Sequence, residues 1–292
     1  MTRLAAAAEN FGRDLDTAYA TIERLLAESR GAQLLALPEA CLGGYLSSLG
    51  SSEDRGTTGS RRARPGPPPL RLDGPELRRV AELAGDTVVV LGLCEDGGDD
   101  LGGDLYNTAV VLTGDGILGV HRKVHQPLGE NLSYAAGSVF EAFDTPVGRI
   151  GLQICYDKAF PEAARAAALD GAEIVVSISA WPGSRTASSA DLAQDRWKKR
   201  FDLYDQARAL ENQVVWVAAN QAGTFGSLRF VGSAKVVGPG GEVLAGTGVE
   251  AGLAVADVDV AAELAAARRS MFNLRDRRPD TYDALVREPA RA

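Results

Sequence analysis

Short apolar segments that alternate with helical patterns constrain the fold of this chain more than any other feature. Residues 87–93 form an almost unbroken run of Val and Leu, which is typical of a strand buried on both faces. Similar apolar segments, each expected to be a strand, lie at 32–37, 148–154, 174–179 and 214–219. The chain is therefore expected to fold around buried β-structure.

Helical periodicity and glycine-containing turns fill the intervals between these strands. Helices are expected at 15–26, at 76–84, at 161–170 and from about 191 onward. Hairpins are expected to pair 106–112 with 117–121, 139–143 with 148–154, and 228–237 with 242–245. The order of elements in the first half thus recurs in the second half. We expect an α/β fold, a four-layer α-β-β-α sandwich in which two β-sheets pack face to face with helices outside.

Composition limits the class of protein. The chain has 292 residues, of which 45% are hydrophobic, and its net charge is −8. Because no linker divides it, we expect one domain over residues 1–270 and a polar tail over 271–292 that is either disordered or in contact with a partner subunit. The acidic charge argues against nucleic acid and anionic membranes as partners.

Location and redox state follow from similar arguments. The chain contains neither an apolar run of transmembrane length nor a secretory signal pattern, so we expect a cytoplasmic protein. Its three cysteines are an odd number without a C-x-x-C pair, which fits a reducing compartment and argues against a disulfide framework or a zinc ribbon.

One segment does not fit the alternating pattern. Residues 47–69 are rich in Ser, Gly, Arg and Pro, a composition that cannot bury much apolar surface. We expect a mobile loop there, serving either as a lid over a nearby site or as a solvated insertion without a role.

Three of the expected strands end near a chemically potent side chain. Glu39 follows 32–37, Lys123 follows 117–121, and Cys155 follows 148–154 directly. A base, a cation and a nucleophile are the set that acyl transfer requires, provided that the three strand ends converge. Each residue alone also fits an ordinary role, because surface carboxylates, solvated lysines and buried structural cysteines are common.

The chain resembles the nitrilase (carbon–nitrogen hydrolase) superfamily through an ordered set of short motifs between about residues 3 and 260. The motifs are Leu37-Pro38-Glu39 with Gly44-Tyr45, Tyr106-Asn107-Thr108 with Asp115-Gly116, Arg122-Lys123, Cys155-Tyr156-Asp157, Ala180-Trp181-Pro182, 208–212 and Asn220. Each motif is short, and their common order carries the resemblance.

The resemblance implies a mechanism without histidine. Cys155 would form a thioester, Glu39 would transfer protons, and Lys123 with the backbone N–H of Tyr156 would hold the oxyanion. Glu130 matches a fourth family position, a carboxylate that orients the lysine. The resemblance also implies no metal or organic cofactor, and a homodimer or larger homo-oligomer.

The sequence also bears on three other kinds of site: a Cys–His pair, a serine hydrolase and a dinucleotide site. His121 and His125 are the only histidines, and a papain-like pair of Cys155 with either one leaves Glu39 and Lys123 unexplained. The absence of a Gly-x-Ser-x-Gly motif argues against a serine hydrolase. A Gly-x-Gly-x-x-Gly match at 114–119 precedes a strand rather than a helix, so it is not a dinucleotide site.

Four aromatic residues are candidates for the walls of a substrate pocket, and ordinary core packing is the alternative for each. They are Tyr45, Tyr134, Tyr156 and Trp181. Tyr156 and Asp157 follow the cysteine where true nitrilases have Trp-Glu, which resembles the amidase and carbamoylase branches. We therefore expect hydrolysis of a small amide or N-carbamoyl compound. Nitrile hydrolysis and a catalytically silent interaction protein are the alternatives.

Overall fold

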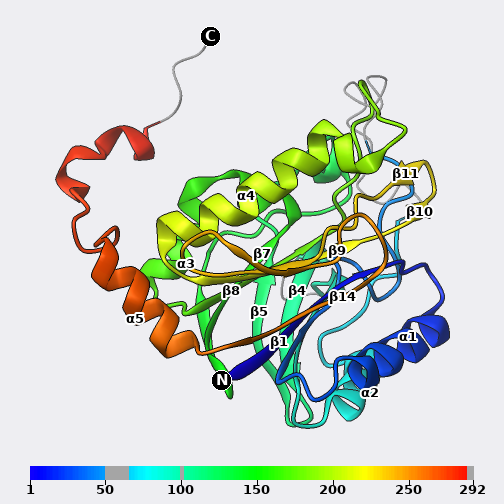
Figure 1. Cartoon of the computed structure of the whole chain (residues 1–292). Coiled ribbons are helices and arrows are strands. Elements are labelled where there is room, and N and C mark those ends of the chain that lie inside the picture. Colours follow the sequence, from blue (N-terminus) through cyan, green and yellow to red (C-terminus); the bar gives the residue numbers. More distant parts are fainter. Residues whose placement is uncertain (50–65, 99–101, 288–292) are drawn as a thin grey trace.

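The computed structural model describes residues 1–49, 66–98 and 102–287. It has a mixed α/β fold, which confirms the expected class (Figure 1). The first part of the chain forms β1 (Thr2–Glu9), α1 (Leu15–Glu28), β2 (Leu34–Ala36), α2 (Pro75–Ala84), β3 (Val88–Asp96), β4 (Leu105–Thr113), β5 (Gly116–Arg122) and the 3₁₀ turn η4 (Glu130–Leu132).

The second part repeats strands and helices in a similar order. It forms β6 (Ala142–Thr145), β7 (Gly148–Ile154), the 3₁₀ turn η5 (Cys155–Ala159), α3 (Pro161–Leu169), β8 (Ile174–Ser179), η6 (Leu192–Gln194), α4 (Arg196–Asn212), β9 (Val215–Gln221), β10 (Thr224–Phe225), β11 (Leu228–Arg229), β12 (Lys235–Val237), β13 (Val243–Gly246), β14 (Gly252–Val258), α5 (Val260–Ser270), η7 (Pro279–Thr281) and η8 (Asp283–Val286).

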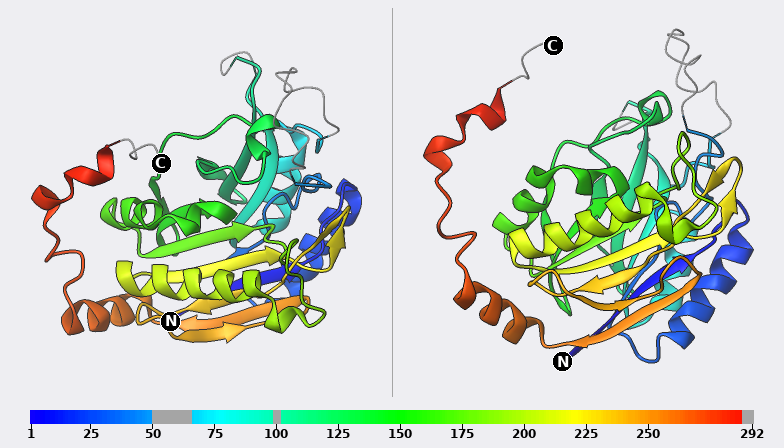
Figure 2. Two further views of the ribbon diagram at one scale, coloured as in Figure 1. Left: turned by 90° about the horizontal axis from the view of Figure 1, so that it is seen from above. Right: turned by 45° about the horizontal axis from the view of Figure 1, so that its top comes forward.

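Twelve of the described strands form one connected sheet that folds back on itself, and β10 and β11 form a separate two-stranded sheet. The order of the larger sheet is β5-β4-β3-β2-β1-β9-β8-β7-β6, and the two halves join where β1 pairs with β9 at Ala8–Asn220 and Glu9–Gln221. The prediction was of two sheets packed face to face, and this pairing joins the two halves into one sheet. The halves face each other across a shared apolar core, and Figure 2 shows α1 and α2 beside one half with α3 and α4 beside the other.

Strand β1 lies at the centre of this sheet and was not predicted as a strand. It pairs with β2 and β9 in parallel and with β14 in antiparallel orientation. Leu4, Ala6 and Ala8 face the core between the two halves, whereas Ala5 and Ala7 face α1 and α2. Since alanine has low β-propensity, the strand depends on these pairings and on burial of both faces.

Two expected elements have different boundaries. The predicted strand 228–237 is interrupted by Gly232 and Ser233, both with positive φ, so that only β11 and β12 remain. The long helix begins at Arg196 rather than near Asp191. Asp195 is its N-cap, because its carboxylate accepts the Trp197 N–H at 2.8 Å.

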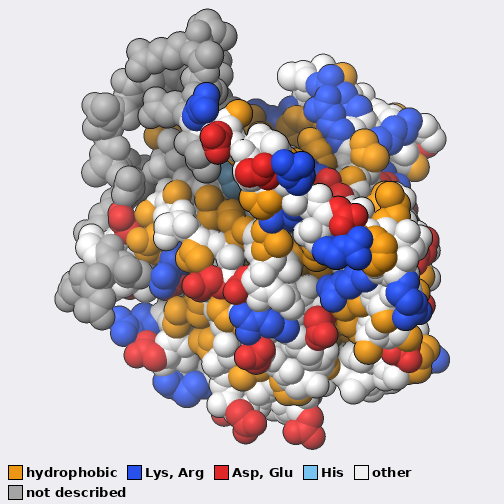
Figure 3. All heavy atoms as spheres, turned by 90° about the vertical axis from the view of Figure 1, so that its left-hand side faces the viewer, with side chains coloured by type: hydrophobic (Ala, Val, Ile, Leu, Met, Phe, Trp, Pro, Cys, Tyr) orange, Lys and Arg blue, Asp and Glu red, His pale blue; other side chains and the backbone are white. Residues whose placement is uncertain are grey.

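Two peripheral segments were predicted from the sequence, a loop at 47–69 and a tail beyond residue 270. The loop expected at 47–69, with its lid hypothesis, lies mostly outside the described residues. Beyond α5 the chain extends away from the sheets (Figures 1 and 2), and Met271 and Phe272 are exposed. No helix in the described part of the chain is long and apolar enough to cross a membrane. On the face in Figure 3, acidic and basic side chains are interspersed.

Glycine at position 92 of β3 permits the turn that carries Glu39 to approach the sheet closely. A Cβ at this position would lie 2.5 Å from the Ala40 nitrogen and 2.9 Å from the Glu39 Cα. Both contacts are with backbone, so the turn itself would have to move. Gly92 therefore sets the position of Glu39.

We predict that Gly92→Ala destabilises the protein by about 1–3 kcal/mol, as overpacking does. If Glu39 is the base that the family resemblance implies, its displacement should also lower kcat by roughly 10²-fold. Gly12→Ala is the matched control, since a Cβ there meets nothing within 4 Å. Urea unfolding and steady-state rates measure the two effects. Unchanged kcat in folded Gly92→Ala contradicts the positioning role.

Candidate active site

A buried lysine between two carboxylates forms the centre of the site. The Lys123 Nζ lies 2.8 Å from the Glu39 Oε1 and 2.7 Å from the Glu130 Oε2. All three side chains are fully buried. The sequence predicted each of these residues, and the structure brings the three together.

Glu39 is held by both halves of the sheet. It follows β2, and its Oε2 accepts the backbone N–H of Ala180, just beyond β8, at 2.6 Å. Its own N–H donates to the Ser179 carbonyl at 3.3 Å, and the Gln221 side chain donates to its carbonyl at 3.0 Å. Backbone and side chain are thus both anchored, which fixes the direction of the carboxylate.

Two further side chains bind the carboxylates. The Asn107 amide, from β4, donates to the Glu39 Oε1 at 2.7 Å and to the Glu130 Oε1 at 2.9 Å. The Tyr45 hydroxyl donates to the Glu130 Oε1 at 3.0 Å. Asn107 was predicted only as part of a motif, without a role. A lone amide within an apolar strand was the available signal, because a buried polar group needs partners.

The charges of this cluster depend on one another. Burial alone would lower the pKa of Lys123, but the negative charges of Glu130 and Glu39 outweigh it and raise that pKa above its ordinary value. Burial raises the pKa of Glu130, with Lys123 opposing and Glu39 adding to the effect. The lysine therefore remains a cation, and its two carboxylates share one positive charge.

Cys155 lies where β7 ends and η5 begins. Its φ of 51° is in the left-handed region, an uncommon conformation for a residue with a Cβ and one often found at functional sites. Burial raises the pKa of its thiol well above the ordinary value, the charge of Glu39 adds to this, and Lys123 opposes it. The resting sulfur is thus a neutral thiol that needs a base for activation.

Both histidines bind Asp157 instead of the cysteine. The His121 Nε2 lies 3.1 Å from one carboxylate oxygen of Asp157, and the His125 Nδ1 lies 2.9 Å from the other. Although burial would raise the pKa of Asp157, the hydrogen bonds from these histidines lower it well below its usual range. The Asp157 carboxylate also accepts the Ile154 N–H and so supports the turn at Cys155. This geometry does not support a papain-like pair.

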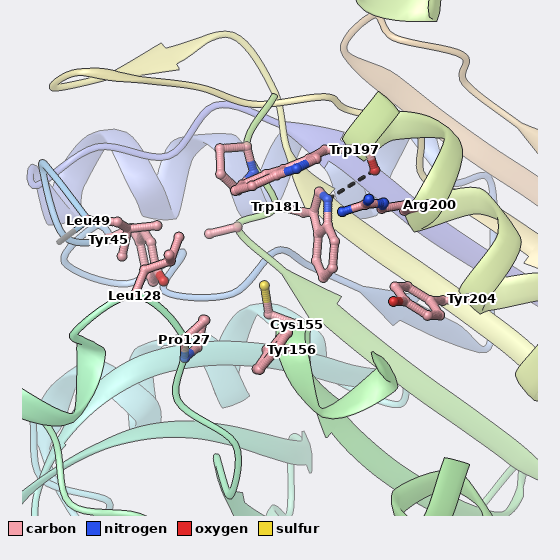
Figure 4. A pocket seen from close by; sticks show the side chains of 12 residues that line it. Tyr45, Leu49, Pro127, Leu128, Cys155, Tyr156, Trp181, Trp197, Arg200 and Tyr204 are labelled. Carbon is pink, nitrogen blue, oxygen red and sulfur yellow. Dashed lines mark hydrogen bonds between the residues drawn. The ribbon is translucent and has the colours of Figure 1, made fainter. Parts of the chain in front are cut away.

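A cavity of about 310 Å³ opens onto the sulfur of Cys155 (Figure 4). Three of the four predicted wall residues, Tyr45, Tyr156 and Trp181, line it. Tyr134 is buried in the same apolar cluster as Tyr45 and Cys94, outside the cavity lining. The other lining residues are Leu49, Pro127, Leu128, Ala180, Pro182, Trp197, Arg200 and Tyr204.

A second buried ionic cluster ties α4, one wall of the cavity, to the turn that carries Cys155. The Lys158 Nζ lies 2.6 Å from Asp205 on α4, and the Lys235 Nζ lies 2.8 Å from the other oxygen of that carboxylate. The Arg208 Nε donates to the Lys158 carbonyl at 2.9 Å. This cluster was not predicted from the sequence. Lys158, Asp205 and Lys235 lie in η5, α4 and β12, which meet only in the folded chain.

A neutral thiol at the edge of a cavity, next to a fully buried carboxylate–lysine cluster, can carry out nucleophilic acyl transfer. Within residues 1–49, 66–98 and 102–287, no group of three or more His, Cys, Asp or Glu side chains is placed to hold a metal ion.

The carbon–nitrogen hydrolase family model matches residues 3–268. The chain therefore belongs to the carbon–nitrogen hydrolase family, and it is a carbon–nitrogen hydrolase enzyme. It is 36% identical to a probable nitrilase of Schizosaccharomyces pombe over 186 residues, which cover 62% of this chain and 63% of that relative. It is 31% identical to the N-carbamoylputrescine amidase of Solanum tuberosum, over 94% of this chain and 91% of that relative.

Solved structures show the same fold. A carbon–nitrogen hydrolase from Helicobacter pylori matches with a TM-score of 0.79 and 26% identity, covering 98% of both chains. A mutant of an amidase from Nesterenkonia sp. matches with a TM-score of 0.71 and 26% identity, covering 98% of this chain and 100% of that chain. That structure shows the result of Michael addition of acrylamide at the amidase's active-site cysteine.

We predict that Lys123→Met destabilises the protein by about 3–5 kcal/mol at pH 8, because it leaves two buried carboxylates without a cation. Burial then raises the folded-state pKa of Glu130 further above the unfolded value of about 4.3, because the opposing charge of Lys123 is gone. Stability is therefore retained below that pH and lost as pH rises through the raised pKa. The deficit relative to wild type should be smaller at pH 5 than at pH 8.

Urea unfolding at the two pH values measures this difference. Lys123→Met/Glu130→Gln is the matched variant, since it removes one of the two uncompensated carboxylates and should recover part of the loss at pH 8. A deficit that is equal at both pH values, and not reduced in the double variant, contradicts the shared-charge interpretation.

Proposed function

We propose that this enzyme hydrolyses a C–N bond in a small amide or N-carbamoyl compound through a thioester at Cys155. The observation that carries the proposal is the Cys155 sulfur at the cavity, next to the buried cluster of Lys123, Glu39 and Glu130. The thiol is neutral at rest, so its activation requires the neighbouring Glu39.

In the first half-reaction, Glu39 takes the proton of the Cys155 thiol while the sulfur attacks the substrate carbonyl carbon. The carbonyl oxygen becomes an oxyanion, which the Lys123 ammonium and the Tyr156 N–H stabilise. Tyr156 lies in the first turn of η5, where backbone N–H groups lack a partner within the turn. Glu39 then protonates the leaving nitrogen, the C–N bond breaks, and ammonia or an amine departs.

In the second half-reaction, Glu39 takes a proton from water, and the resulting hydroxide attacks the thioester carbon. The C–S bond breaks, and the thiolate of Cys155 regains the proton from Glu39. For an amide the product is a carboxylic acid, and for an N-carbamoyl compound it is a carbamic acid that decomposes to carbon dioxide and an amine. Glu130 has no proton to transfer in this scheme and acts by orienting Lys123.

The relatives support this proposal. The Nesterenkonia amidase reacts at its active-site cysteine, and Cys155 is the cysteine at the cavity here. The N-carbamoylputrescine amidase is similar over nearly the whole chain, which favours amide or carbamoyl substrates. The name of the Schizosaccharomyces pombe relative, a probable nitrilase, favours nitrile hydrolysis as the second candidate.

Two structural details belong to the same proposal. We propose that the folded-back sheet and its outer helices form a four-layer α-β-β-α sandwich. The apolar cores between the sheet halves and beneath the helices support this description. We also propose that residues 271–292 form a tail distinct from the domain at 1–270 and contact a second copy of the chain. The exposed apolar side chains of Met271, Phe272 and Leu285 support such a contact.

We predict that Cys155→Ala abolishes turnover while leaving the fold intact, because it removes the nucleophile from the cavity edge. Cys94→Ala is the control: it lies in β3 away from the cavity, so it should lower stability and leave kcat unchanged. Iodoacetamide should label Cys155 before Cys94 or Cys41, because Cys155 borders the cavity, whereas Cys94 and Cys41 are not part of its lining.

Mass spectrometry after rapid quenching should detect the acyl adduct on Cys155 in the wild type. More than a few per cent of wild-type kcat in Cys155→Ala would rule out the thioester. Selective labelling of Cys155 without hydrolysis of any amide, carbamoyl compound or nitrile would instead support a silent interaction protein.

We predict that kcat/KM for an amide exceeds that for the nitrile of the same acyl group by at least about 10-fold. An amide forms an oxyanion that Lys123 and the Tyr156 N–H stabilise directly, whereas a nitrile forms a thioimidate that must first add water. Ammonia release from matched pairs measures the ratio. Faster turnover of the nitrile across several pairs would establish nitrile hydrolysis instead.

A further inference from the structure

The described lining of the cavity contains one permanently charged side chain. Arg200 of α4 is the only charged Lys, Arg, Asp or Glu side chain among the described residues that line it. The rest of the described lining is largely aromatic and apolar, so the guanidinium stands out as the group that can select a charged ligand.

Among the residues that the structure describes, Arg200 is also the one basic residue in this part of α4 without a hydrogen-bond or ion-pair partner. Arg196 donates to the hydroxyls of Ser184 and Thr186, Lys198 pairs with Asp202 at 2.7 Å, and Lys199 donates to Gln194. In each case the partner is a neighbouring residue that is not part of the cavity lining. No hydrogen bond or ion pair joins Arg200 to another described residue, so its five N–H donors are available to a ligand.

Helix geometry explains why Arg200 faces the cavity. Trp197, Arg200 and Tyr204 are spaced by three and four residues, which places them on one side of α4. Figure 4 shows the Arg200 side chain extending from α4 toward the rings of Trp181 and Trp197. The ionic cluster of Lys158, Asp205 and Lys235 ties α4 to the turn that carries Cys155. The guanidinium and the sulfur therefore border the same space.

We infer that Arg200 binds a carboxylate of the substrate, remote from the carbonyl that Cys155 attacks. This inference rests on the proposed amide hydrolysis and names its substrate class: a monoamide of a dicarboxylic acid or an N-carbamoyl amino acid. The planar guanidinium matches a carboxylate in a bidentate arrangement. At about 310 Å³ the cavity is near the small end of ligand pockets, which favours short spacers.

The inference also separates this enzyme from its relative in Solanum tuberosum. The name N-carbamoylputrescine amidase denotes a substrate that carries an amine. A protonated amine at the remote end of the substrate would approach Arg200 and be repelled. We therefore expect this chain to reject cationic amides of the length at which it accepts anionic ones.

Three amides with one carbon skeleton test the inference: glutaramic acid (anionic), pentanamide (neutral) and 5-aminopentanamide (cationic). The wild type should show the highest kcat/KM for the anion and the lowest for the cation. Arg200→Gln should lower kcat/KM for the anion by roughly 10- to 100-fold, the range expected for hydrogen bonds to a charged group. The loss should lie mainly in KM, and the neutral amide should change by less than about 3-fold.

Lys199→Gln is the matched control, since it removes one positive charge from the same helix turn at a residue outside the cavity lining. It should leave the three rates in their wild-type order. Arg200→Glu should reverse the order and favour the cationic amide. Equal rates for anion and neutral amide, unchanged by Arg200→Gln, would overturn the subsite while leaving amide hydrolysis established.

A binding measurement keeps the subsite testable if none of the three amides is hydrolysed. Calorimetric titration of glutarate into Cys155→Ala should show binding that weakens at least about 10-fold on adding Arg200→Gln, but not on adding Lys199→Gln. Glutarate binding that is absent, or indifferent to Arg200→Gln, would overturn the subsite. Absence of hydrolysis with every amide, with glutarate bound as expected, would overturn the proposed function alone.

Discussion

The buried ion pair of Lys123 with Glu39 and Glu130 is the interaction on which the rest of the site depends. Removing charges from water costs several kcal/mol for each ion, so the cluster persists only with close partners and additional hydrogen bonds. Asn107, Tyr45 and the Ala180 N–H supply these bonds. The folded-back sheet is therefore needed, because β2, β4 and the chain after β8 must meet at one point. Such a cluster positions a charge for chemistry at the cost of stability.

The proposed nucleophile and the proposed recognition residue come from other elements than this cluster. Cys155 ends β7 in the opposite half of the sheet, and Arg200 lies on α4. The Asp205 carboxylate, buried between Lys158 and Lys235, connects these two elements. As a result, the part of the cavity wall on α4 can change its side chains without disturbing the charges around Lys123. This separation gives a physical reason why similar chains carry amidase and nitrilase names.

Short-range patterns predicted much of the fold. Helices α1, α2 and α3 and strands β3, β4, β5, β7 and β8 lie where periodicity and turn residues indicated them. Strand β1 was missed, because its alanines have low β-propensity and the strand is held by three neighbouring strands. The start of α4 was misplaced for a local reason, since the chain before the Asp195 cap forms a 3₁₀ turn that resembles a helix in sequence.

The sequence by itself determined the mixed α/β class, the family, and the residue types at positions 39, 123, 130 and 155, because strand ends and short motifs are local properties. Only the tertiary structure decided that both histidines bind Asp157, that Asn107 joins the two carboxylates, and that Tyr134 lies outside the cavity. It also decided that Arg200, one of several basic residues in its helix turn, has no hydrogen bond or ion pair with another residue that the structure describes. Such distinctions depend on which distant segments meet, and no local pattern along the chain encodes those contacts.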